Sequence, residues 1–469
     1  MSMSLLLGWL CSLLLGSSIW LAIAGPPRRL SDGLAAAGYS VLLGVLGSGL
    51  LVGLRSEISG EGIFVATLPL LGVISAFFLG VGYWRWRRAT PAFPVPAAST
   101  ESLPRWCWLL LVLIAIRFAF VLDEAMLRPV FAWDAWNAWS LKAKTWFSLG
   151  QVPYLEPAAW WQDSGTAGHT ALAWRYPELL SRAELWFAGA AGGWNEGAVA
   201  TAWPLLWLAL ISGCAGQWMA LGVSRLHSLI LAYMLASLPL LSVHAGLAGY
   251  ADIWVAAALT FAVLSWMRWV RDDDRAQLLF ALLCIALLPL LKFEGAVWAL
   301  LLVGLALLAQ VPVRWRWAGL GAGLLLALLA MLVSWLLQLP WLALVGETLS
   351  GVTTNGGEVS RVTAALAFLN GLFGQNNWHL LWPLLAACVI WRRDVLRRQR
   401  ETALLAVLVA GGLAALFCLF AFTPAAKWAA SETATNRLVL HWVPLALSLL
   451  GLLLRDVPWP TRTPPVSPR

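Results

Sequence analysis

A short tryptophan-rich stretch, FAWDAWNAWSLKAKTWF at residues 131–147, combines one acid and two bases with a row of aromatic side chains. A carboxylate such as that of Asp134 acts as a general base on a hydroxyl group, and ammonium groups neutralise the charge of a phosphate. Asp134 is therefore a candidate catalytic base, and Lys142 and Lys144 are candidates for holding a lipid phosphate. The alternatives are a helix N-cap for Asp134 and lysines whose ammonium groups simply extend to the headgroup layer.

The same stretch has the periodicity of an amphipathic helix. On a helix that begins at Asp134, the tryptophans Trp136, Trp139 and Trp146 share one face. Lys144 lies on the opposite face with Asp134. Because indole rings favour the headgroup level of a bilayer, we expect a helix that lies in the membrane interface.

Further polar side chains are expected on the same side of the membrane, and we assign them to substrate binding. They are Arg175, Tyr176, Asp252, Lys292, Glu294 and Arg437. Glu294 is expected to pair with Lys292. Asp252 begins an apolar run, so an N-cap is its alternative role. The histidines and cysteines lack metal-ligand spacing, so we predict no metal or other cofactor and leave a divalent metal as an unsupported alternative.

The elements that position these residues are transmembrane helices. The chain has 469 residues, 61% of them hydrophobic, and a mean hydropathy of +0.78, which excludes an ordinary soluble domain. Apolar runs long enough to cross a bilayer recur throughout, so we predict an all-α integral membrane protein with about 13 transmembrane helices. The predicted spans are residues 5–24, 34–54, 62–83, 106–122, 197–221, 227–243, 251–269, 276–291, 295–310, 317–338, 378–391, 402–422 and 438–454.

Charge placement predicts the topology. Arginine clusters follow alternate spans, which predicts a multi-pass protein of the cell inner (plasma) membrane with its N-terminus outside and its C-terminus in the cytoplasm. The first apolar run is followed by Arg28 and Arg29, which favours an uncleaved anchor over a signal peptide. The net charge of +8 is explained by these loops and does not indicate nucleic-acid binding.

Four regions follow from this topology. Residues 1–105 form a three-helix membrane segment with a cytoplasmic linker, and residues 106–338 form the membrane core that carries the outer loop 123–196. Residues 339–454 supply the C-terminal helices with a second outer loop at 339–377, and residues 455–469 form a disordered tail.

An ordered set of motifs resembles the GT-C glycosyltransferases. WDAWNAWSLKAK, after a span, is similar to the Asp-bearing start of their first outer loop, and residues 175–207 resemble the passage that leads back into the membrane. GYADIWVAAALTF, LLKFEGAVWALL and ATNRLVLHWVPL resemble an acid-initiated span, a lysine segment and a late Arg-then-Pro helix. The nearest branch is that of the protein O-mannosyltransferases and the lipid A aminoarabinose transferase. Ala135 departs from it, because the family has Glu after the Asp.

The resemblance implies an inverting membrane glycosyltransferase in which Asp134 activates an acceptor hydroxyl and Lys292 and Arg437 contact the lipid phosphate. Nucleotide sugars are cytoplasmic, whereas the candidate site faces outward, so the expected donor is a sugar on polyprenyl phosphate. The acceptor stays open among protein, lipid and polysaccharide. The alternatives are a transporter or flippase of lipid-linked sugars and an O-antigen ligase or polymerase.

Overall fold

The computed structural model describes residues 2–54, 62–88, 103–150, 176–310, 359–423 and 425–457. Every regular element within these ranges is an α-helix. A helix satisfies its own backbone hydrogen bonds, which is what a lipid environment demands of a spanning segment. The predicted span 317–338, the linker, most of the second outer loop and nearly all of the tail lie outside the described residues.

Within the described residues, six helical segments are long and apolar enough to cross a membrane. They are α1 (Met3–Ala24), α2 (Leu30–Gly53), α3 (Gly62–Arg88), the segment Glu196–Ala220 formed by α8 (Glu196–Ala200) and α9 (Ala202–Ala220), α12 (Asp252–Asp272) and α20 (Arg400–Phe422). Among the described residues, four shorter apolar helices lie at other predicted spans: α13 (Arg275–Leu291), α14 (Phe293–Gln310), α18 (Leu381–Trp391) and α23 (Val443–Leu454). A fifth, α17 (Arg361–Phe373), lies within the predicted outer loop 339–377, so this part of the loop is an apolar helix. The chain is therefore an α-helical, multi-pass membrane protein.

The predicted span at residues 227–243 is interrupted. The chain forms α10 (Arg225–Ser237) and α11 (Pro239–Gly246), which are bent by 61°. The bend falls at Pro239, which has no backbone N–H to donate and holds Leu238 in an extended conformation. The pair is a broken span or a re-entrant segment.

The other described helices include one, α4, whose residues overlap the predicted fourth span; the rest are shorter. They are α4 (Cys107–Leu127), α5 (Trp133–Asn137), α6 (Trp139–Leu149), α7 (Leu179–Ala191), α19 (Arg393–Arg398), α21 (Ala426–Ala430) and α22 (Thr435–Leu440). Three of them, α5, α6 and α22, carry residues that the sequence assigned to the site.

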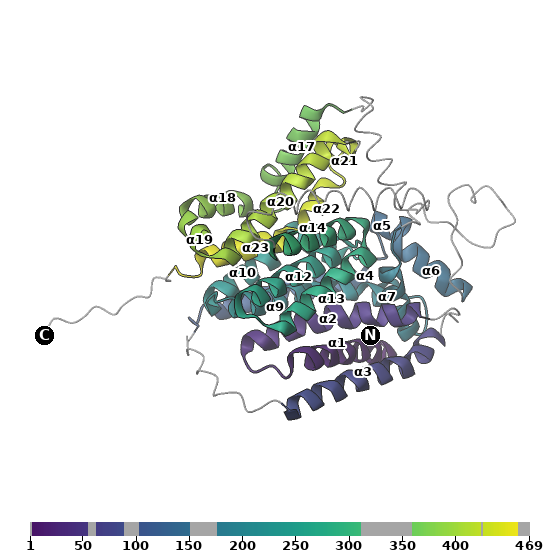
Figure 1. Cartoon of the computed structure of the whole chain (residues 1–469). Coiled ribbons are helices and arrows are strands. Elements are labelled where there is room, and N and C mark those ends of the chain that lie inside the picture. The colour runs from purple at the N-terminus through teal and green to yellow at the C-terminus, as the bar shows by residue number, and fades with distance from the viewer. Residues whose placement is uncertain are drawn as a thin grey trace, which may run out of the picture.

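The bundle is arranged around α12. In Figure 1, α1, α2 and α3 lie along one edge, α9, α12 and α13 occupy the middle, and α17 to α23 lie at the opposite edge. Every residue of α12 from Asp252 to Met267 is buried, as expected for a helix that is apolar on all sides. The start of α12 is therefore enclosed by the other helices, whereas its last turn, from Arg268 onward, reaches the surface.

Small residues let α1 and α2 pack closely. A Cβ atom on Gly16 would lie 1.9 Å from the carbonyl oxygen of Ser40, and one on Gly44 would lie 2.0 Å from that of Ser12. The hydroxyl groups of Ser12 and Ser48 are 2.9 Å apart and hydrogen-bonded. Small residues that recur every fourth position allow this approach and make α1 and α2 a tightly joined pair.

Candidate functional site

The tryptophan-rich stretch forms two helices, so the single amphipathic helix predicted for it is wrong. The break is at Ala138, where φ is −140° and ψ is −82°. It lets Trp139 and Trp146 pack inside the protein, whereas Trp136 stays exposed. Only part of the tryptophan row is therefore available to the membrane interface. The N-cap of α5 is Ala132 rather than Asp134, so the capping alternative for Asp134 is also wrong.

Asp134 contacts Arg437, which follows it by 303 residues. Nη1 of Arg437 donates to Oδ1 of Asp134 over 3.1 Å, and Nη2 of Arg437 donates to Oδ2. The two side chains are 18% and 21% exposed, so this pair forms the open side of the site. Two parallel bonds between a guanidinium and a carboxylate give a strong, oriented interaction.

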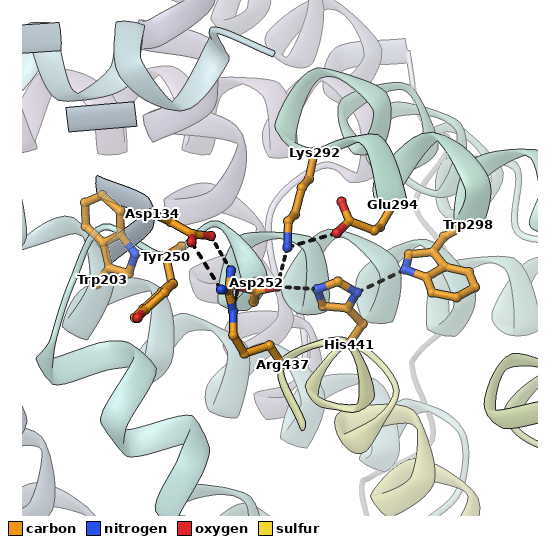
Figure 2. Close-up of polar contacts among 9 residues, drawn as sticks. All are labelled: Asp134, Trp203, Tyr250, Asp252, Lys292, Glu294, Trp298, Arg437 and His441. Atoms are coloured by element: carbon orange, nitrogen blue, oxygen red, sulfur yellow. Dashed lines mark hydrogen bonds and ion pairs between the residues drawn. The ribbon is translucent and has the colours of Figure 1, made fainter. Parts of the chain in front are cut away.

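Asp252 is the buried centre of the site (Figure 2). Its Oδ2 accepts bonds from Nε and Nη2 of Arg437 over 3.1 and 2.9 Å. Its Oδ1 accepts from Nζ of Lys292 over 2.8 Å and from Nε2 of His441 over 3.1 Å. The side chain is 0% exposed, and these cations compensate the cost of burying its charge. Ala251 is the N-cap of α12, so the N-cap alternative for Asp252 is wrong.

Lys292 lies at the junction of α13 and α14, where the backbone is extended. Its Nζ is 3.2 Å from Oε1 of Glu294, which confirms the expected pairing of these two residues. Oε2 of Glu294 has no hydrogen-bond partner among the described residues. The Glu294 side chain is 26% exposed, but this Oε2 is buried, so its carboxylate extends the buried part of the cluster.

His441 and Trp298 belong to the site, although the sequence did not assign them to it. Nε1 of Trp298 donates to Nδ1 of His441 over 3.0 Å. An indole N–H only donates, so Nδ1 accepts and Nε2 carries the proton that is donated to Asp252. The spacing of His441 four residues after Arg437 places both on one helical face and was the available signal.

Tyr250 completes the environment of Arg437. The guanidinium carbon lies 4.5 Å from the centre of the Tyr250 ring, a cation–π contact that orients the arginine. The backbone carbonyl of Tyr250 accepts from Nε1 of Trp203 over 2.8 Å. The backbone of Tyr250 is thus held in place by Trp203, a buried residue of the bundle.

Lys142 and Lys144, both predicted to hold a lipid phosphate, have different environments in the structure. Lys142 is buried, and its Nζ donates to the backbone carbonyl of Tyr176 over 2.8 Å, so the idea that Lys142 extends to the headgroups is wrong. Burial lowers the pKa of Lys142 to about 8, and the charge of Glu178 opposes that shift. Lys144 is exposed and forms an ion pair with Glu196 over 3.1 Å, with no hydrogen bond or ion pair to the Asp252 cluster.

Tyr176 connects the first outer loop to the site, and Arg175 lies outside the described residues. The Tyr176 ring lies 5.3 Å from Trp139 and 5.0 Å from Phe293, which stands between Lys292 and Glu294 in the chain. The charge of Glu294, followed by burial, raises the pKa of Tyr176. Tyr176 therefore borders the cluster, as expected for a residue that shapes its entrance.

Glu184 on α7 is a buried carboxyl group that the sequence did not single out. Its Oε1 accepts from the hydroxyl of Ser140 over 2.9 Å. Burial raises the pKa of Glu184 to about 8, and the Ser140 hydrogen bond opposes that shift. Glu184 is therefore protonated in the folded protein at pH 7 and ionised in the unfolded chain.

The raised pKa of Glu184 predicts a loss of stability at alkaline pH. The folded protein binds one more proton than the unfolded chain between the ordinary glutamate pKa and about 8, so stability is greatest below that window and falls as pH rises through it. The slope approaches about 1.4 kcal/mol per pH unit. Thermal unfolding in detergent between pH 5 and 8 is expected to show this fall in the wild type and a flatter profile in Glu184→Gln. Equal profiles would show that Glu184 ionises normally.

The assembled cluster combines acid–base groups with anion-binding groups. Asp134, Asp252 and Glu294 are separated by the cations Arg437 and Lys292. Within the described ranges, no group of three His, Cys, Asp or Glu side chains is placed to hold a metal ion. The arrangement suits a reaction in which a carboxylate takes a proton while cations stabilise a developing negative charge.

These features define a class of protein: a multi-pass helical membrane protein with a partly buried carboxylate–arginine–lysine–histidine cluster. Comparison with protein-family models, curated proteins and solved structures found no match. The function is therefore argued from the geometry of this cluster.

Proposed function

We propose that the protein is a GT-C-type glycosyltransferase that transfers a sugar from a polyprenyl-phosphate donor to an acceptor hydroxyl. In this proposal the chain crosses the inner membrane about 13 times, its N-terminus lies outside, and the cluster faces the periplasm. No metal or other cofactor takes part. The acceptor is a hydroxyl of a protein, lipid or polysaccharide.

The observation that carries the proposal is the convergence of four distant segments on one site. Asp134 comes from α5, Asp252 from the start of α12, Lys292 from the junction of α13 and α14, and Arg437 from α22. These are four of the segments that resemble GT-C motifs, and their polar side chains meet through direct contacts. A chance set of interfacial charges would have no reason to join in this way.

The geometry suggests how the reaction would proceed. The donor phosphate competes with Asp134 for Arg437, which frees the Asp134 carboxylate to accept the proton of the acceptor hydroxyl. The acceptor oxygen bonds to the anomeric carbon as the bond from that carbon to the phosphate oxygen breaks. Asp134 becomes neutral as the leaving phosphate gains charge, and Arg437 and Lys292 stabilise that charge. Attack from the side opposite the phosphate inverts the anomeric centre.

Asp252 and His441 would act by positioning. Asp252 is fully buried and accepts four hydrogen bonds, so its oxygens have no room for a substrate. It holds Arg437 and Lys292 in a fixed relation, and His441 is fixed in turn by Trp298. Such preorganisation keeps the cations aimed at the phosphate before the reaction begins.

The competing function is a transporter or flippase of lipid-linked sugars. Such a protein is expected to carry ionisable residues midway along its spans. Arg117 fits that description, since its Nε donates to the hydroxyl of Ser242 over 3.1 Å between α4 and α11. The larger cluster, however, lies at helix ends, where a headgroup would meet it. This placement favours the enzyme.

The fate of the bound sugar distinguishes the two functions. We expect the full chain, purified from its native membrane in mild detergent, to retain a polyprenyl phosphate sugar that mass spectrometry detects in the lipid extract. Adding cell-envelope acceptor material should convert the bound lipid to free polyprenyl phosphate and lengthen a glycan. Movement of the intact lipid across vesicles without loss of sugar would instead identify a carrier.

A further inference from the structure

A second polar site lies at the other end of α12. Arg268 follows Asp252 by 16 residues, which corresponds to about 24 Å along the helix axis. There the ends of α1, α2, α3, α12 and α13 surround a cavity of about 380 Å³. This volume is within the usual range of about 300–1,000 Å³ for small-ligand pockets. The cavity is separate from the Asp134 cluster and plays no part in the proposed glycosyl transfer.

The inner wall of the cavity is built from buried polar side chains. Gln277 from α13 accepts at its Oε1 from Nε2 of Gln217 over 3.2 Å, and both side chains are buried. Oε1 of Gln217 accepts in turn from Nη1 of Arg268 over 3.4 Å. Three helices therefore hold the Arg268 guanidinium at the cavity wall.

The charge of Arg268 is incompletely compensated. Its side chain is only 13% exposed, and its nearest carboxylate oxygen, on Asp274, is 3.7 Å away. Its Nε is buried without a hydrogen-bond partner among the described residues. A buried guanidinium with an unused N–H is a favourable partner for an anion, because it gains a charge-assisted hydrogen bond that the protein alone does not supply.

The other charges around the cavity favour the same ligand. Asp32 accepts from the backbone N–H of Arg29 over 3.2 Å, and Asp274 accepts from that of Ala276 over 3.0 Å, so both acids cap helices. Arg28 is exposed at the cavity, and no hydrogen bond or ion pair joins its guanidinium to another described residue. Three arginines, Arg28, Arg85 and Arg268, and two acids, Asp32 and Asp274, line the cavity, so the net charge of its lining is positive.

The outer side of the cavity is bordered by the exposed end of α3. Trp86 of α3 lines the cavity and is exposed, and Trp84 next to it is also exposed. Both indoles lie near the end of a helix that is long and apolar enough to span the membrane. Tryptophan favours the headgroup level, so a ligand could reach Arg268 with its chain along α3 and its polar end in the cavity.

We propose that this cavity binds the phosphate headgroup of an anionic amphiphile at the membrane face opposite the Asp134 cluster. Arg268 binds the phosphate from the inner wall, Arg28 adds a second positive charge, and Trp86 borders the apolar part of the ligand. The phosphate could also come from a soluble ester, and the test below separates the two sources.

Binding is measured on the full chain in neutral detergent by native mass spectrometry. The probes are phosphatidic acid, phosphatidylcholine of the same chain length, and soluble glycerol 3-phosphate. We expect phosphatidic acid to bind in preference to the other two, and Arg268→Gln to lower its affinity about tenfold, as for the loss of one charge-assisted hydrogen bond. The matched control is Arg397→Gln, which removes an exposed arginine of α19 outside the cavity and should leave the affinity unchanged.

A second variant keeps the proposal testable if Arg268→Gln fails to fold. Arg28 is exposed and supports no helix contact, so Arg28→Gln should fold and lower the affinity for phosphatidic acid severalfold. Equal affinity in this variant, in Arg268→Gln where it folds, and in the wild type would overturn the site. Glycerol 3-phosphate binding as tightly as phosphatidic acid would overturn the amphiphile and identify a soluble phosphate ligand.

Discussion

Replacing Asp134 with Asn is expected to lower the rate of sugar transfer by about 10²- to 10⁴-fold, the usual contribution of a general base. The amide has nearly the same shape but does not take up the acceptor's proton. It also removes one of the two negative charges that Arg437 meets, so the arginine stays free to bind a phosphate. The measurement is transfer of labelled sugar from membrane lipids by wild type and variant in matched amounts. Donor binding should persist while kcat falls.

The matched control for this variant is Asp123→Asn. Asp123 is an exposed acid at the end of α4, and no ion pair joins it to another described residue. It undergoes the same chemical change as Asp134 but lies outside the cluster, so transfer should continue at the wild-type rate. Full activity of Asp134→Asn in a correctly inserted protein would contradict the proposed mechanism. Equal losses in both variants would point to a general effect on insertion.

Replacing Asp252 with Asn is expected to destabilise the folded protein by about 3–5 kcal/mol, because it removes the central charge of a buried ion-pair network. Arg437 and Lys292 would then face a neutral amide inside the bundle. The amide N–H₂ would also point a donor at side chains that themselves donate. Thermal unfolding in detergent, followed by loss of monodisperse protein, measures the change.

Asp273→Asn is the control for this second variant. Asp273 ends the same helix, is exposed, and has a φ of +53°, a conformation that asparagine adopts readily. The same substitution there should leave the unfolding temperature within about 1 °C of wild type, since exposed changes have small effects. If Asp252→Asn were as stable as this control, Asp252 would not be the ionised centre of the network.

Local sequence already contained part of the site. Lys292 and Glu294 are two residues apart, so their ion pair follows from proximity in the chain. Asp134, Asp252 and Arg437 could be selected because ionised side chains are costly beside a membrane and stand out in an apolar sequence. The helical, membrane-spanning nature of the chain follows from its long apolar runs.

Other features depended on contacts between distant segments. Lys142 and Lys144 look alike in the sequence, yet one is buried and the other forms an exposed ion pair with Glu196. The break at Ala138 separates the predicted faces of the tryptophan-rich helix. Sequence periodicity assumes a continuous helix, so it could not foresee a break set by packing.

The apolar runs alone predict a bundle of helices with a few ionisable residues near their ends. The contact of Asp134 with Arg437, the four hydrogen bonds of Asp252 and the cavity beside Arg268 become visible only once the helices are packed. A helix that is apolar on every side has no periodic signal that indicates which neighbour it packs against, and pairing between helix ends depends on that packing.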